Sequence, residues 1–255
     1  MEIIQYLGEE NVFKFVLLFA RMSGLVAFFP FFGHMQIPVV VKTAIVFFLT
    51  LFLYPYASLA PLSPVLVEVV FAFMMELMLG FISGLMVYLV FAALEIAGQQ
   101  ISFVMGFTMA SVIDPQTGVN TPLVGQVLMM LALVVFLAFD GHHLILLFYH
   151  YSLGELPLGS FYPHPNMWTY ISNAVLGMFL LGFIFSFPVK ALSLLSDIIF
   201  GMLMKTMPQF NLLVVGFPIK IMLSYVVMMT VLSSIMIIFK KEILSTLNTL
   251  PSLFF

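Results

Sequence analysis

Charge is scarce in this 255-residue chain: Asp, Glu, Lys and Arg make up 7% of it, against roughly 25% in soluble domains. So few charges could not keep a folded particle in water, and 63% of the residues are hydrophobic. The apolar runs are too long for transmembrane β-strands, which need only about 10 residues of alternating polarity. The composition therefore predicts an all-α membrane protein.

Cysteine is absent, which excludes disulfides, thiol catalysis and Cys-ligated zinc or iron–sulfur centres. The motifs of nucleophilic, phosphate-binding and dinucleotide-binding sites are missing too, so we expect no enzymatic activity and no cofactor. There is no basic patch to suggest nucleic acid. The N-terminal segment is acidic and lacks the basic region of a signal peptide, so we expect its first hydrophobic run to remain in the mature protein.

Uncharged runs approach the length of about 20 residues that spans a bilayer. They lie at 22–41, 43–67, 77–94, 115–139, 156–189 and 221–239, with a weaker one at 96–113. They predict five or six transmembrane helices. Helix starts are expected at Ser63-Pro64, at Thr121-Pro122 and after Asn166, and Asp114-Pro115 is expected to end a helix.

The last third of the chain does not fit a simple topology in which successive helices cross the membrane one after another. Lysines flank the run 221–239 on both sides, whereas the positive-inside rule favours one face of the membrane. Interruptions at Met207-Pro208 and at Gly216-Phe217-Pro218 predict broken helices here. Such breaks at membrane depth need protein or water beside them.

Several charges fall within or beside apolar stretches, where each costs roughly 2.5–3.5 kcal/mol at a helix centre. They are Lys14, Arg21, Glu68, Glu76, Glu95, Lys190 and Asp197. One interpretation is an ion or proton path. The favoured interpretation is a set of buried pairs that fix helix register or contact partner subunits. Spacing places Lys14 with Arg21, and Lys190 with Asp197, on common helix faces.

For three further patterns we favour a structural interpretation over a functional one. Gly80 and Gly84 form a GxxxG motif, which allows close helix packing within the chain or with a partner; the former is preferred. The DGHH at 140–143 lacks the i, i+4 spacing of helical metal ligands and predicts an interfacial turn, not a metal site. The 20 methionines suit a compliant seal around a passing chain, but core filling is the simpler explanation.

The stretch GFTMASVIDPQTGVNTP at 106–122 is an unusually polar interior segment. Its prolines and glycines predict that one helix stops, the chain turns and another helix begins. Its polar groups need water or shielding protein at membrane depth.

Four segments in order along nearly the whole chain resemble those of the FliR family of type III export-gate components. They are RMSGLVAFFPFFG with IPVVVK, AGQQISFVMGFTMASVIDPQTGVNTPLVGQ, DGHH with YSLGELPLG, and MPQFNLLVVGFPIK. Hydrophobic strings match by chance one at a time, but four in the expected order are specific together.

The resemblance implies a non-enzymatic, structural and gating subunit built of helical hairpins with broken helices in a spiral assembly. Its partners would be FliP-like and FliQ-like subunits, an FlhB-like protein and unfolded flagellar subunits in transit. The location would be the bacterial inner membrane. About 1–190 would form a FliP-like part and about 191–255 a FliQ-like part.

The resemblance also implies that the polar segment is a loop that plugs the pore. The plug residues would be Gly106, Phe107, Thr108, Met109, Ala110, Ser111, Val112, Ile113, Asp114, Pro115, Gln116, Thr117, Gly118, Val119, Asn120, Thr121 and Pro122. Met105 and Met109 would contribute to a flexible seal.

Two alternatives stay open at this point. The first is the homologous component of a virulence injectisome, which differs in cargo more than in chemistry. The second is a small-solute or ion transporter that uses Arg21, Glu76 and Glu95. Inverted repeats with matching broken helices would favour the transporter, and none is visible. An intramembrane enzyme lacks a nucleophile–base set.

Overall fold

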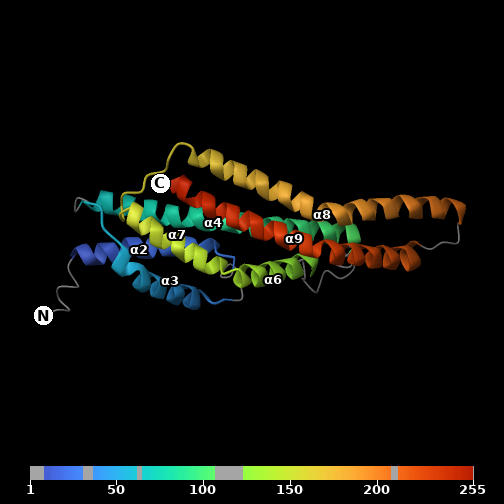
Figure 1. Ribbon diagram of the computed structural model, residues 1–255, viewed down its shortest axis with the longest axis horizontal. Helices are drawn as coiled ribbons and strands as arrows, with labels where there is room; N and C mark the ends of the chain where they lie inside the picture. Colours follow the sequence, from blue (N-terminus) through green and yellow to red (C-terminus); the bar gives the residue numbers. More distant parts are fainter. Residues whose placement is uncertain (1–8, 31–36, 62–64, 107–122, 208–211, 255) are drawn as a thin grey trace. The chain divides into compact units, whose positions relative to one another are not determined.

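The computed structural model describes residues 9–30, 37–61, 65–106, 123–207 and 212–254 (Figure 1). Their helices are α2 (Glu9–Phe28), α3 (Val39–Leu53), the 3-10 turn η1 (Tyr54–Tyr56), α4 (Leu66–Met105), α6 (Leu123–Ala138), α7 (Gly141–Glu155), α8 (Met167–Thr206), the π-helical turn η2 (Leu212–Gly216) and α9 (Phe217–Phe254). The described residues contain no β-strand, only an isolated bridge between Leu59 and Leu158. The predicted all-α class is confirmed.

Within the described residues, five helices are long and apolar enough to cross a membrane, or six if α6 and α7 count as one bent span. The predicted number of spans is therefore confirmed, but the limits of the helices differ from the uncharged runs. Helices α4 and α8 have 40 residues each and α9 has 38. At 1.5 Å per residue each reaches about 60 Å, about twice a bilayer's hydrocarbon core. The run 77–94 marked only the middle of α4.

The helix boundaries follow several of the predicted signals. Helix α8 begins directly after Asn166, whose carbonyl accepts the Tyr170 N–H at 3.2 Å. It ends at Thr206, directly before Met207, so the helix end predicted here is confirmed, while Pro208 lies outside the described residues. The π-helical turn η2 continues directly into α9 at Phe217, so the structure shows a change of helix type at Gly216-Phe217-Pro218 and not the predicted interruption.

The signals at Ser63-Pro64, Asp114-Pro115 and Thr121-Pro122 fall outside the described residues, so these three predictions stay untested.

The helices build two compact units. Unit 1 comprises residues 1–89, 137–174 and 243–255, and unit 2 comprises residues 90–136 and 175–242. Helices α2, α3 and α7 belong to unit 1 and most of α6 to unit 2, while α4, α8 and α9 supply segments to both. Neither unit is continuous in sequence, so each depends on long-range packing.

In unit 1, α2 and α4 are in backbone contact. A Cβ atom built on Gly80 would lie 2.0 Å from the Arg21 carbonyl oxygen, and one on Gly24 would lie 2.4 Å from that of Leu77. One turn along α4, a Cβ on Gly84 would meet the Leu25 carbonyl oxygen at 2.9 Å. No side chain fits at Gly24 or Gly80 unless the backbones move apart. The GxxxG motif thus packs within the chain, as we predicted.

Candidate functional site

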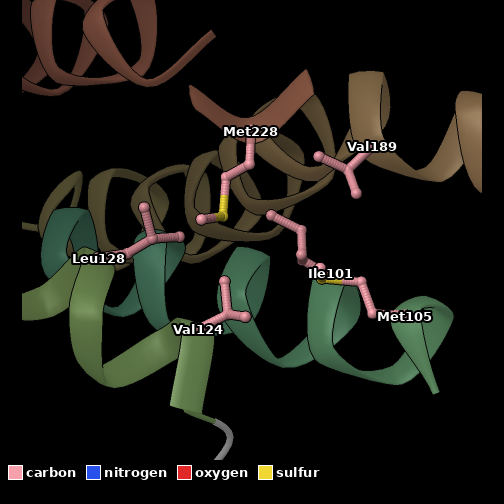
Figure 2. Close-up of a cluster of buried hydrophobic side chains, with 6 residues drawn as sticks. All are labelled: Ile101, Met105, Val124, Leu128, Val189 and Met228. Carbon is pink, nitrogen blue, oxygen red and sulfur yellow. The ribbon is translucent and has the colours of Figure 1, made fainter. Parts of the chain in front are cut away.

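The two ends of the polar segment 106–122 are attached to one apolar cluster in unit 2, which we call the loop-base cluster. Figure 2 shows its six buried side chains converging from four helices. They are Ile101 and Met105 of α4, Val124 and Leu128 of α6, Val189 of α8 and Met228 of α9. None is more than 8% exposed. The chain therefore leaves the cluster at the end of α4 and re-enters it at the start of α6.

Backbone contact fixes α4 to α6 beside this cluster. A Cβ atom built on Gly98 would lie 2.2 Å from the Gly125 Cα and 2.5 Å from its nitrogen. Gly106 ends α4 with φ of 87°, in the left-handed region that glycine adopts without steric cost. A Cβ there would approach the ring of Phe217 to 3.2 Å. Glycine is thus needed both where the helices touch and where the segment departs.

Side chains of α8 tie the last turns of α4 in place. The Gln100 side-chain oxygen accepts a hydrogen bond from the Lys190 ammonium group and another from the Ser186 hydroxyl at 2.8 Å. One turn further along, the Ser193 hydroxyl donates to the Val104 carbonyl at 3.1 Å. The end of α4 that leads into the polar segment is held by polar bonds on one side and apolar packing on the other.

The structure places Met105, a predicted seal residue, in the loop-base cluster with 0% exposure. Its side chain holds the start of the segment. Met109 and the other predicted plug residues from 107 to 122 lie outside the described residues, and only Gly106 of that set is described.

A second polar site lies in unit 1, where Arg21 of α2 meets Glu76 of α4. Arg21 Nε donates to Glu76 Oε2 at 2.5 Å and Nη2 donates to Oε1 at 3.0 Å. Both side chains are fully buried. Glu76 Oε1 also accepts the Gly159 N–H at 2.8 Å, while the guanidinium donates to Ser152 Oγ at 3.2 Å and to the Leu156 carbonyl at 3.4 Å.

This network satisfies both charges with fixed partners from three parts of the chain. A bidentate pair with extra hydrogen bonds is the arrangement in which a buried ion pair survives desolvation. The structure thus brings Arg21 and Glu76 together as a buried pair between α2 and α4, and the favoured interpretation that such pairs fix helix register stays a prediction. Next to it, the hydroxyls of Ser83 and Tyr149 share a hydrogen bond, and Ser152 donates to the Tyr149 carbonyl at 3.0 Å.

Lys190 and Asp197 use different partners from each other. Lys190 bonds Gln100, as described above, and Asp197 pairs with Lys220 of α9. The Lys220 ammonium group donates to the two Asp197 oxygens at 2.7 and 2.9 Å. The Lys220 side chain is 10% exposed and that of Asp197 54%. This pair joins α8 to α9 within unit 2.

The three remaining predicted charges are dispersed. The Lys14 ammonium group lies 4.5 Å from the centre of the Tyr54 ring, a cation–π contact. Glu68 is exposed in the first turn of α4. Glu95 is half-buried on α4, within unit 2. Sequence reasoning missed Ser152, Gly159 and Gln100 as partners, because a lone hydroxyl, amide or backbone N–H carries no sequence pattern.

Across the described part of the chain, no three His, Asp or Glu side chains gather in a group that could hold a metal ion. The DGHH segment begins with a turn at Asp140, whose φ is 57°, and its residues Gly141, His142 and His143 start helix α7. The turn predicted at 140–143 is therefore confirmed at Asp140 alone.

Comparison with known proteins decides the family. The family described as "Bacterial export proteins, family 1" matches residues 12–246. A flagellar biosynthetic protein FliR of Bacillus subtilis (strain 168) is 33% identical over 242 residues, which cover 94% of this chain and 93% of the relative. The chain belongs to the FliR family of bacterial export proteins. Two more FliR relatives, from Pectobacterium carotovorum and Escherichia coli (strain K12), are 30% and 27% identical and cover 82% and 85% of this chain, and 80% and 82% of their own lengths.

Membership of the FliR family, together with the membrane-capable helices, makes this a membrane component of flagellar export. The resemblance drawn from the four sequence segments is confirmed. The match at 12–246 includes the Arg21–Glu76 network, the loop-base cluster and the polar segment between α4 and α6.

Proposed function

We propose that this chain is a structural and gating subunit of the flagellar type III export channel, and that segment 106–122 plugs the pore. It would assemble with FliP-like and FliQ-like subunits in the bacterial inner membrane, beside an FlhB-like protein. Unfolded flagellar subunits would pass through the assembled pore. The proposed role involves no catalysis, because the chain would only help to form the pore and to open and close it.

One observation supports the plug assignment: Met105 and Val124, which flank the polar segment in the chain, lie in the same buried cluster. Side chains of four helices form that cluster, and Gly98 and Gly125 bring α4 and α6 into backbone contact beside it. The described residues on both sides of the segment, Gly106 and Leu123, therefore follow and precede helices that contact each other directly. That arrangement suits a closure that must return to one position after each passage.

The exposed apolar surface supports assembly with other subunits. In the apolar 18-residue windows that make these helices membrane-capable, only 22% of the α8 window and 17% of the α9 window are buried within the chain, against 72% of the α4 window. Helices of about 60 Å exceed the bilayer core, so lipid alone would not cover them. We propose that FliP-like and FliQ-like subunits cover the remainder. The expected division into a FliP-like part at about 1–190 and a FliQ-like part at about 191–255 remains part of this proposal.

Of the three residues that the transporter alternative would use, Arg21 and Glu76 form an ion pair with each other. Arg21 and Glu76 already bind each other with both side chains fully buried, which leaves neither free to carry an ion. The flagellar role is favoured over the injectisome role because the relatives reported above are flagellar biosynthetic proteins.

The test is to replace residues 110–120 with a Gly-Ser linker of equal length in the full chain. We expect the variant to co-purify with its partner subunits as the parent does, because the loop-base cluster is untouched, and to make the membrane permeable to small ions. The control replaces His164-Pro165, in the exposed connection before α8, with Gly-Ser and leaves the membrane tight. An assembled 110–120 variant that stays tight would refute the plug; a chain that purifies as a functional monomer would refute the export-channel role.

A further inference from the structure

An open hollow of about 270 Å³ lies between α2 and α3 in unit 1. Its walls are mainly apolar, with Phe19 and Val26 from α2 and Val46 from α3. Lys42, one turn from the start of α3, also lines the hollow. It is thus an apolar groove with a single cationic group among its lining residues.

The charge of Lys42 is unused within the described residues. Its half-buried side chain has no carboxylate partner and no hydrogen-bond acceptor there. The two hydroxyls that line the hollow are already committed, since Ser23 donates to the Phe19 carbonyl and Thr43 to the Val39 carbonyl at 3.0 Å. A ligand for this hollow therefore needs an anionic group for Lys42 and an apolar part for the walls.

The surroundings of the hollow indicate where such a ligand comes from. Helix α3 turns large apolar side chains outward, with Val40 78% exposed and Phe48 68% exposed, and only 17% of its span is buried. Such a face suits contact with lipid tails. Lys42 lies near one end of the span, the depth at which a lysine reaches the phosphates of the headgroup layer.

We propose that this hollow binds one anionic glycerophospholipid. Its phosphate would contact Lys42, and part of one acyl chain would lie against Phe19, Val26 and Val46. The hollow is smaller than the about 300–1,000 Å³ of sites that enclose a drug-sized ligand, so the rest of the lipid would extend along the outer face of α3. Basic pockets between transmembrane helices bind anionic headgroups in this way. The proposal does not depend on the plug.

Native mass spectrometry of the full-length chain tests it, after delipidation in mild detergent and incubation with equal amounts of phosphatidylglycerol and phosphatidylcholine. We expect the parent chain to retain one phosphatidylglycerol with a preference on the order of fivefold, the contribution of one lysine to anionic lipid binding. Lys42→Gln should reduce the preference to about one, and Lys42→Arg should preserve it.

Two further variants test whether lipid binding depends on this hollow or on the total positive charge of the chain. Lys205→Gln removes an exposed lysine of α8 and should leave the preference unchanged. Ala27→Phe fills the hollow from an exposed position on its rim and should lower retention of both lipids. An unchanged preference in Lys42→Gln would overturn the proposal, as would an equal loss in Lys205→Gln. A photoreactive residue at position 27 should crosslink to lipid in cells, and crosslinking to protein alone would also overturn it.

Discussion

Arg21 and Glu76 lie 55 positions apart in the sequence and form a bidentate ion pair in which both side chains are fully buried. The pair joins α2 to α4 at the level where Gly80 brings the two backbones together. Glu76 also binds the backbone of Gly159, so the connection that follows α7 is joined to the same site. The most polar residues of unit 1 thus specify how three separated segments meet.

Glu76→Gln should destabilise the chain strongly. It leaves the Arg21 guanidinium buried without a counter-charge, and breaking one side of a buried pair typically costs about 3–5 kcal/mol. We expect a much lower thermal midpoint in detergent and a lower yield in the membrane.

Glu68→Gln is the matched control, because Glu68 is an exposed residue on the same helix. It should change the midpoint little. If both variants melt together with the parent, the pair does not hold α2 to α4.

Alanine substitution should affect thermal stability differently at glycines that touch a neighbouring backbone and at glycines that do not. Gly80→Ala would place a methyl group 2.0 Å from the Arg21 carbonyl oxygen, so α2 and α4 must move apart at a cost of about 1–3 kcal/mol or more. Gly177→Ala meets nothing within 4 Å, and alanine is the better helix former by up to about 1 kcal/mol. Thermal midpoints of the two variants should therefore shift in opposite directions. A shared direction would contradict the packing of α2 on α4.

The Lys220–Asp197 pair should respond unequally to the loss of either partner. Lys220→Met leaves a carboxylate that is more than half exposed, and we expect a cost within about 1 kcal/mol. Asp197→Asn leaves an ammonium group whose side chain is 10% exposed, and the lost charge-assisted bond should cost about 1–3 kcal/mol. Chemical unfolding of the two variants in the same detergent measures the difference. Equal effects would mean that the burial of Lys220 does not govern the pair.

The proposed plug predicts a crosslinking pattern that the absence of cysteine makes clean. A single cysteine at Ser111 should crosslink to an export substrate stalled in the channel. A single cysteine at Ser172, an exposed residue near the start of α8, should not. Crosslinking at both positions, or only at Ser172, would place the path of the substrate away from segment 106–122.

Much of the architecture was predictable because bilayer chemistry constrains it. A scarcity of charge indicated a membrane protein, and apolar runs gave the number of spans. Local signals such as Asn166 and Met207-Pro208 marked real helix limits, since a cap and a proline act within one turn of the backbone. The GxxxG motif was also interpretable, because only small residues allow such close backbones.

Helix length and pairing were less predictable, for a physical reason. Uncharged runs stop at Glu76 and Lys190, but a charge that is hydrogen-bonded by its neighbours does not end a helix. Helix α4 consequently continues through Glu76. The partner of each charge depends on tertiary structure: Lys190 and Asp197 share a helix face, yet one binds Gln100 and the other Lys220.

The contact between Gly98 and Gly125 has an evolutionary consequence. Because Gly98, Gly125 and the buried cluster hold α4 against α6, we expect this joint to form whatever residues follow Gly106. Those residues can then differ between relatives while the joint stays the same. A chimera carrying the equivalent segment of the Bacillus subtilis relative should therefore fold as the parent does, which would make the segment an interchangeable cassette.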